Sequence, residues 1–186
     1  SYRAVDDMAR SGSRCQLGTN LDVLGEGTSV GSAREWASPS GRGAYLDVLH
    51  LRLGLDPVIA AAGDIACAPA DKNFSGGNGS KGSCRMQATS KLLASIDPAV
   101  VLPLGDIQYE CGDAPGFGSS YAPSWGRLKE RTRPAIGNHE DGSACGRADA
   151  SPYFDYFGPL AGNRNEGWYS YDVGPWHLIA LNSECG

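Results

Sequence analysis

The stretch AVVLPLGDIQYE, which runs from Ala99 to Glu110, gives the first indication of the fold. It begins with an unbroken run of apolar and β-branched residues, and such a run is typical of a buried strand. Gly105 and Asp106 follow at once, so the strand would deliver a carboxylate to the edge of a sheet. Asp106 is therefore a candidate ligand at that edge.

The same pattern occurs twice more. PVIAAAGD is a short apolar run that ends at Asp64, and RPAIGNHE ends in a segment that contains Asn138 and His139. The gaps of about forty and about thirty residues between these ends suit βαβ crossovers, which place consecutive strands parallel. Open α/β sheets bind ligands at the carboxyl ends of their strands. We therefore predict an α/β fold in which these polar side chains converge on one spot.

Hydrophobic spacing and turn residues predict the remaining elements from residue 56 onward. The expected elements, in order, are a loop over Cys67–Ser83, a helix over Cys84–Ile96, a loop over Cys111–Ser120, a helix over Tyr121–Arg131, a strand over Pro134–Ile136, an aromatic helix over Ala150–Gly158 and a hairpin formed by Trp168–Val173 and Trp176–Asn182.

Residues 1–55 carry no motif. They mix Gly, Ser and Arg with short apolar pieces, and only Ala44–Leu53 is apolar enough to suggest a strand. We interpret this segment as a linker, the tail of an upstream domain or poorly ordered sequence. The remaining segment, 56–186, stops just after a strand that should lead into a loop and helix. We therefore expect a fragment truncated at both ends.

Composition excludes some functions. With a net charge of −5 over 186 residues, no broad basic surface for nucleic acid is indicated. No apolar run is long enough to cross a membrane. Oligomeric state is left open by the sequence.

The six cysteines show no CxxC pair, which argues against a zinc ribbon or a thioredoxin motif. Their even number, with few Lys and many Gly, Ser and Asn, favours a secreted or cell-surface protein with disulfides over a cytosolic one. Fifteen pairings are open. We hypothesise that Cys67–Cys84 closes the Gly-rich loop and that Cys111–Cys145 ties two loops at the strand ends.

The oxygen atoms of two carboxylates and an amide carbonyl on neighbouring strand ends would repel one another if left bare. A bound cation would remove this repulsion. Asp106 belongs to the strand that is central in sequence, so it is placed to bridge two metal ions. Such a dinuclear centre can bind a phosphoryl group and lower the pKa of a bridging water. The glycine before each ligand lets backbone and substrate approach closely.

The motifs GD, GDIQYE and GNHE, in this order and at these spacings, resemble those of the metallophosphoesterase (calcineurin-like phosphoesterase) superfamily. GDxxY at Asp106–Tyr109 is most similar to the purple acid phosphatase branch, and YSYDVGPWHLIALNSE is similar to the segment that follows GNHE there. The resemblance covers residues 56–186. It implies a layered αββα sandwich of which the C-terminal half is absent here.

The resemblance also implies roles for individual residues. Asp64 would bind the first metal, Asp106 both, and Asn138 the second. His139 would hydrogen-bond the phosphate or protonate the leaving group, with Glu140 orienting it. The cofactors would be two divalent or trivalent metal ions, with iron, manganese or zinc favoured.

The chain departs from the family pattern in two places. Much of the superfamily has GDxH in the first motif, where this chain has Ala66, and Tyr109 would replace the missing ligand as a phenolate, as in purple acid phosphatases. The later GH and GHxH motifs are absent, since the three histidines are His50, His139 and His177. We therefore expect an active parent enzyme and a fragment that binds metal weakly and turns over poorly.

Other polar and aromatic residues have a structural interpretation. His177 lies within an apolar strand, and we interpret it as structural. Asn182 and Glu184 stand at the end of that strand and could line the site, but we interpret them as structural too. The aromatic residues of the hairpin are interpreted as packing residues. The segment Gly76–Gly82 lacks the GK[ST] ending of a phosphate-binding loop.

The function expected from the resemblance is hydrolysis of a small phosphoester, a monoester or a diester, by metal-bound hydroxide at a dinuclear centre. The alternative is a non-catalytic secreted α/β surface or binding domain that keeps the fold without a complete metal site. Metal content would separate the two.

Overall fold

The structure is a computed structural model that describes residues 57–80, 82–147 and 149–183. The N-terminal segment 1–56, including His50 and the strand expected at Ala44–Leu53, lies outside these residues. The described elements are β1 (Ile59–Ala62), η1 (Ser75–Gly77), α2 (Met86–Ile96), β2 (Val100–Pro103), α3 (Ala114–Gly116), η2 (Phe117–Tyr121), η3 (Trp125–Arg131), η4 (Ser143–Cys145), α4 (Ser151–Phe157), η5 (Gly158–Ala161), β3 (Tyr169–Val173) and β4 (Trp176–Ala180).

β1 and β2 form a parallel pair, as the βαβ spacing predicts, with Ile59 opposite Val100. The segment after η3 runs parallel along the other side of β2, because the N–H of Ala135 donates to the carbonyl of Pro103 over 2.8 Å. β2 is therefore central in space as well as in sequence. The third segment makes only isolated bridges and not the full strand expected at Pro134–Ile136, since Pro103 of β2 faces this segment and has no N–H to donate to it.

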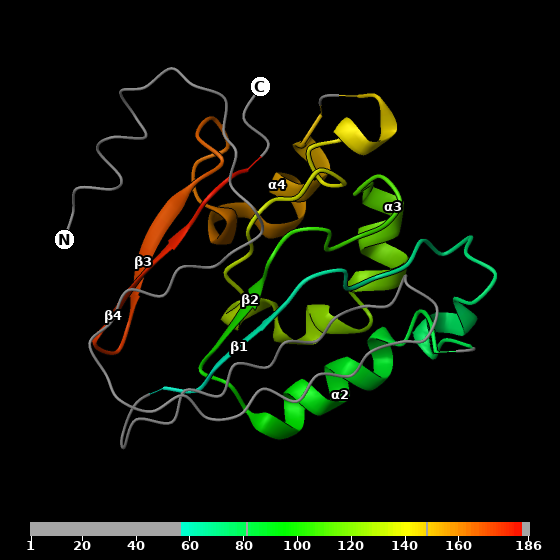
Figure 1. Ribbon diagram of the computed structural model, residues 1–186, viewed down its shortest axis with the longest axis horizontal. Helices are drawn as coiled ribbons and strands as arrows, with labels where there is room; N and C mark the ends of the chain where they lie inside the picture. The colour runs from blue at the N-terminus through cyan, green and yellow to red at the C-terminus, as the bar shows by residue number, and fades with distance from the viewer. Residues whose placement is uncertain (1–56, 81, 148, 184–186) are drawn as a thin grey trace.

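The two faces of β1 and β2 are covered by different layers (Figure 1). Ala60 and Val101 face a core that includes residues from the helices, whereas Ala61 and Leu102 face the hairpin formed by β3 and β4. This alternation follows from the period of two in a strand. The chain thus combines helices and strands in layers, and the general α/β class is confirmed.

The helix predicted before β2 is confirmed as α2, with Met86 and Leu93 buried on its inner face. It ends at Ile96, and the next residue, Asp97, caps it in a left-handed conformation (φ 52°). Pro98 follows and cannot continue the helix.

The segment between Cys111 and Arg131 corrects the sequence prediction. Helical structure begins at Ala114, within the expected loop, because the side chain of Asp113 accepts a hydrogen bond from the N–H of Gly116 (2.8 Å). Asp followed by Pro within the first turn is a start signal for a helix. The expected helix over Tyr121–Arg131 is instead a 3-10 helix that begins at Trp125, and the π-helical turn Phe117–Tyr121 precedes it.

Both hypothesised disulfides, Cys67–Cys84 and Cys111–Cys145, are present. Cys15 and Cys185 lie outside the described residues. Disulfides persist in oxidising compartments, so these two are compatible with a secreted or extracellular protein. Within the described part of the chain, no helix has the length and apolarity needed to span a bilayer.

Candidate metal centre

Three glycines bring the strand ends into backbone contact. A Cβ on Gly137 would lie 2.4 Å from the backbone nitrogen of Asp106, and one on Gly105 would lie 3.1 Å from the Cα of Gly137. A Cβ on Gly63 would lie 3.7 Å from the carbonyl oxygen of Gly105. Only glycine permits this approach at Gly137, so the residues that follow each glycine are brought close together.

Asp64 and Asp106 occupy equivalent positions just beyond β1 and β2. Both adopt left-handed backbone conformations, with φ of 52° and 46°, which non-glycine residues rarely do. The N–H of Ile65 donates to the carbonyl of Asp106 over 3.1 Å and links the two turns. Such local strain is concentrated at functional sites, where the surrounding structure maintains it.

Tyr109 brings the two carboxylates together. Its hydroxyl donates a hydrogen bond to Oδ1 of Asp64 and also lies 3.2 Å from Oδ2 of Asp106. Burial, followed by the hydrogen bond and charge of Asp64 and the charge of Asp106, raises the pKa of Tyr109 well above its ordinary value. Without a cation the phenol therefore keeps its proton and shares it between two acids.

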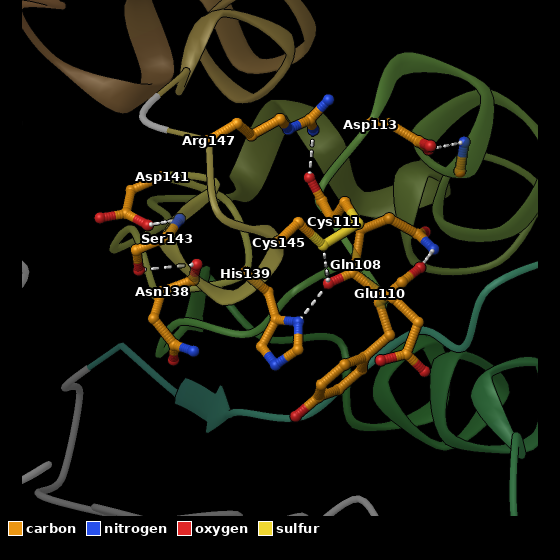
Figure 2. Close-up of a disulfide and its surroundings, with 12 residues drawn as sticks. Gln108, Glu110, Cys111, Asp113, Asn138, His139, Asp141, Ser143, Cys145 and Arg147 are labelled. Carbon is orange, nitrogen blue, oxygen red and sulfur yellow. Dashed lines mark hydrogen bonds between the residues drawn. A yellow bond between two sulfur atoms is a disulfide. The ribbon is translucent and has the colours of Figure 1, made fainter.

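Asn138 and His139 belong to the loop that follows Gly137. Figure 2 shows both side chains on the same side of this loop. The ring of His139 meets the ring of Tyr109 edge-on, with centroids 4.3 Å apart, and its Nδ1 contacts the backbone carbonyl of Glu110. The structure thus brings the predicted residues of all three strand ends into one region.

Glu140 binds backbone N–H groups, whereas the sequence predicted that it would orient His139. Its side chain is fully buried, and its two carboxylate oxygens accept hydrogen bonds from the N–H of Gln108 (2.9 Å) and the N–H of Gly137 (3.2 Å). Burial raises the pKa of Glu140 to about 8; the hydrogen bond from Gln108 opposes this shift and the charge of Asp106 adds to it. Among the described contacts, Glu140 holds two backbone segments together and does not touch the ring of His139.

Of the residues interpreted as structural, His177, Tyr169 and Tyr171 contact neighbouring side chains, whereas Trp168 is exposed and does not pack as expected. His177 is exposed on β4, and its Nδ1 lies 2.7 Å from Oδ1 of Asp172 across the hairpin. Tyr169 and Tyr171 stack with ring centroids 5.6 Å apart. Asn182 follows β4, and Glu184 lies outside the described residues.

One further cluster of ligand-type atoms does not form a metal site. The ligand atoms of Cys67, Asp71 and Cys84 lie within 4.8 Å of one another. The two sulfur atoms are bonded to each other, so neither is available as a thiolate.

The region around Asp64 and Asp106 does fit a cation. The buried Oδ1 of Asp106 has no hydrogen-bond partner among the described residues, and an unsatisfied carboxylate oxygen is costly unless a ligand meets it. The donors at hand are carboxylate, phenol and amide oxygens, which suit hard cations such as iron(III) and manganese(II). Asp64, Asp106, Tyr109 and Asn138 could hold such ions.

Sequence reasoning missed the backbone groups of this region. The carbonyl of Glu110 that meets His139, and the N–H groups that meet Glu140, leave no signal in the pattern of side chains. Buried Gln108 was missed as well, although it lies within the GDIQYE motif.

Comparisons with protein-family models, curated proteins and solved structures give no match to this chain. What the site does must therefore be inferred from its own residues.

Proposed function

We propose that the chain carries the metal site of a phosphoesterase that hydrolyses phosphomonoesters or diesters with two bound metal ions. The supporting observation is that Tyr109 contacts the carboxylates of both Asp64 and Asp106, while the buried Oδ1 of Asp106 has no hydrogen-bond partner in the described part of the chain. Helices on one face of β1 and β2 and a hairpin on the other are compatible with the αββα sandwich of that class.

Asp64 and Tyr109 would hold one ion, Asn138 the other, and Asp106 both. When bound, the ions would neutralise the phosphoryl oxygens and lower the pKa of a water molecule. Tyr109 would bind as a phenolate, because a nearby cation favours the charged form that the two carboxylates disfavour. Iron, manganese and zinc are the candidate metals, and the oxygen-rich donor set favours the first two.

His139 would supply the proton for the leaving group. With Nδ1 held against the carbonyl of Glu110, Nε2 of the protonated ring is the atom left to meet substrate. As water adds to phosphorus and the ester P–O bond breaks, Nε2 would give its proton to the departing oxygen. The ring would then be neutral, and the products would be an alcohol or phenol together with inorganic phosphate from a monoester or a phosphate monoester from a diester.

A second candidate is a non-catalytic α/β binding domain. Within the described residues the histidines are His139 and His177, and His177 is paired with Asp172. Imidazoles that would hold a transition metal firmly are therefore scarce in this part of the chain. A chain that binds no metal would fit this second function.

The test compares the chain with Asp106→Asn, each with iron, manganese or zinc added, on an aryl phosphate monoester and diester. Asp97→Asn is the matched control, since Asp97 is an exposed acid that also has a left-handed backbone, which Asn tolerates. Metal content is measured on the same samples.

We expect metal-dependent hydrolysis that falls by at least about 100-fold in Asp106→Asn and is unchanged in Asp97→Asn. Metal bound without turnover would restrict the proposal to metal binding. No bound metal in the unmodified chain would overturn it and favour the non-catalytic domain.

A further inference from the structure

The ring of His139 is held by a backbone atom rather than by a side chain. Its Nδ1 contacts the carbonyl oxygen of Glu110, which a dashed line marks in Figure 2. A carbonyl oxygen only accepts hydrogen bonds, so Nδ1 must carry the proton whenever this contact is made. The contact therefore selects one of the two neutral tautomers of the ring.

The carbonyl of Glu110 is itself fixed by a covalent link between the two loops. Cys111, the next residue, is bonded to Cys145, which lies 34 positions further along and in the same loop as His139. The Sγ of Cys145 lies 3.5 Å from the carbonyl oxygen of Glu110. The disulfide thus joins the segment that offers the acceptor to the segment that carries the ring.

Two more contacts hold the same pair of loops together. The Nη2 of Arg147 donates to the carbonyl of Cys111 over 2.5 Å. A Cβ on Gly112 would lie 2.7 Å from the Cα of Glu140, so the backbones touch directly beside the disulfide. Arg147 lies on the opposite side of the loop from the ring of His139 (Figure 2), and it contacts the carbonyl of Cys111, the residue that follows Glu110.

We propose that the Cys111–Cys145 disulfide and Arg147 are positioning elements that hold the Glu110 carbonyl against His139 and thereby fix the ring as the Nδ1–H tautomer. This inference rests on the proposed function in one respect, namely that Nε2 donates a proton to the departing oxygen of the substrate. The Nδ1–H tautomer is the form left after Nε2 has given up a proton. The same carbonyl therefore stabilises the ring at the end of that transfer.

Long-range ¹H–¹⁵N spectra of the chain labelled with ¹⁵N-histidine report the tautomer directly, and this measurement does not require the chain to be catalytically active. Spectra are recorded at about pH 9, well above the ordinary imidazole pKa of about 6.5. The His139→Gln variant identifies the signals of His139. The variants compared are Cys111→Ser with Cys145→Ser, and Arg147→Met. The control, Cys67→Ser with Cys84→Ser, removes the other described disulfide, whose sequence separation is 17.

We expect the unmodified chain and the control to show the Nδ1–H pattern. The Cys111/Cys145 double variant should shift toward the Nε2–H form that a free neutral imidazole favours, and Arg147→Met should shift part of the way. Circular dichroism establishes that each variant is folded. If the double variant does not fold, Arg147→Met alone decides the outcome.

An Nε2–H pattern in the unmodified chain would overturn the proposal, as would an unchanged Nδ1–H pattern in the folded variants. A separate assay compares the hydrolysis of an aryl phosphate by the unmodified chain and by the Cys111/Cys145 double variant. We expect the kcat of the double variant to be lower by about 10- to 100-fold. An absence of hydrolysis in the unmodified chain would count against the proposed function and would leave the tautomer result standing.

Discussion

The hydroxyl of Tyr109 donates a hydrogen bond to Oδ1 of Asp64, although the two residues are 45 positions apart in the sequence. The same hydroxyl reaches Asp106, so one proton lies between two acids. A metal ion could take the place of that proton, because it would attract all three oxygens at once. This relationship makes Tyr109 the most informative residue to change.

Tyr109→Phe should abolish the visible absorption band of chain loaded with iron(III), because a phenolate ligand is the source of such a band. Metal affinity should fall by about 10- to 100-fold, a loss typical of disturbed metal sites. The measurements are an absorption spectrum and a metal titration. Tyr171→Phe on β3 is the matched control and should keep the band. A colourless iron-loaded chain would show that Tyr109 is not a ligand.

Gly137→Ala should destabilise the fold by about 1–3 kcal/mol, the usual cost of overpacking. The added Cβ would lie 2.4 Å from the backbone nitrogen and 2.6 Å from Oδ1 of Asp106, and the backbone cannot easily yield. Gly118→Ala is the control, because a Cβ there meets nothing within 4 Å. Urea unfolding measures both variants, and equal stabilities would contradict the close contact.

Glu140→Gln should cost about 1–3 kcal/mol of unfolding free energy, the penalty for leaving a buried donor without an acceptor. A carboxyl group offers lone pairs on both oxygens to the N–H groups of Gln108 and Gly137, whereas an amide nitrogen offers none. The exposed Glu130 on η3 provides the control variant, Glu130→Gln, which should unfold as the unmodified chain does.

The stability of the metal-free chain should decrease as the pH rises from about 4.5 to about 8. Over this range folded Glu140 keeps a proton that the unfolded chain has released, because burial raises the pKa to about 8 from an ordinary 4.5. The unfolded state then binds fewer protons than the folded state, so the free energy of unfolding falls with pH, by at most about 1.4 kcal/mol per unit.

The check is urea unfolding with a chelator present, at several pH values across that range. Glu140→Gln should remove this part of the slope, since an amide does not titrate. A stability of the unmodified chain that rises with pH over the same range would contradict a raised pKa at Glu140.

Local patterns in the sequence were enough to locate much of the fold. The apolar runs that end in Gly-Asp predict β1 and β2 and their parallel order, and helical spacing predicts α2. The segment from Ala114 to Arg131 was not predicted correctly. Its helical turns depend on Asp113 as a cap and on burial of Tyr121 and Trp125, which short-range periodicity does not report.

The two cysteine pairings were one hypothesis among fifteen possibilities, and the structure confirmed them. The sequence by itself determined the α/β class and the strand ends that carry Asp64, Asp106 and Asn138. These features depend on the order of side chains along short segments, so they can be read locally. Only the tertiary structure decided that Glu140 binds backbone N–H groups and that the ring of His139 meets the carbonyl of Glu110. Every residue except proline has the same backbone groups, so no residue type marks where loops distant in sequence bring those groups together.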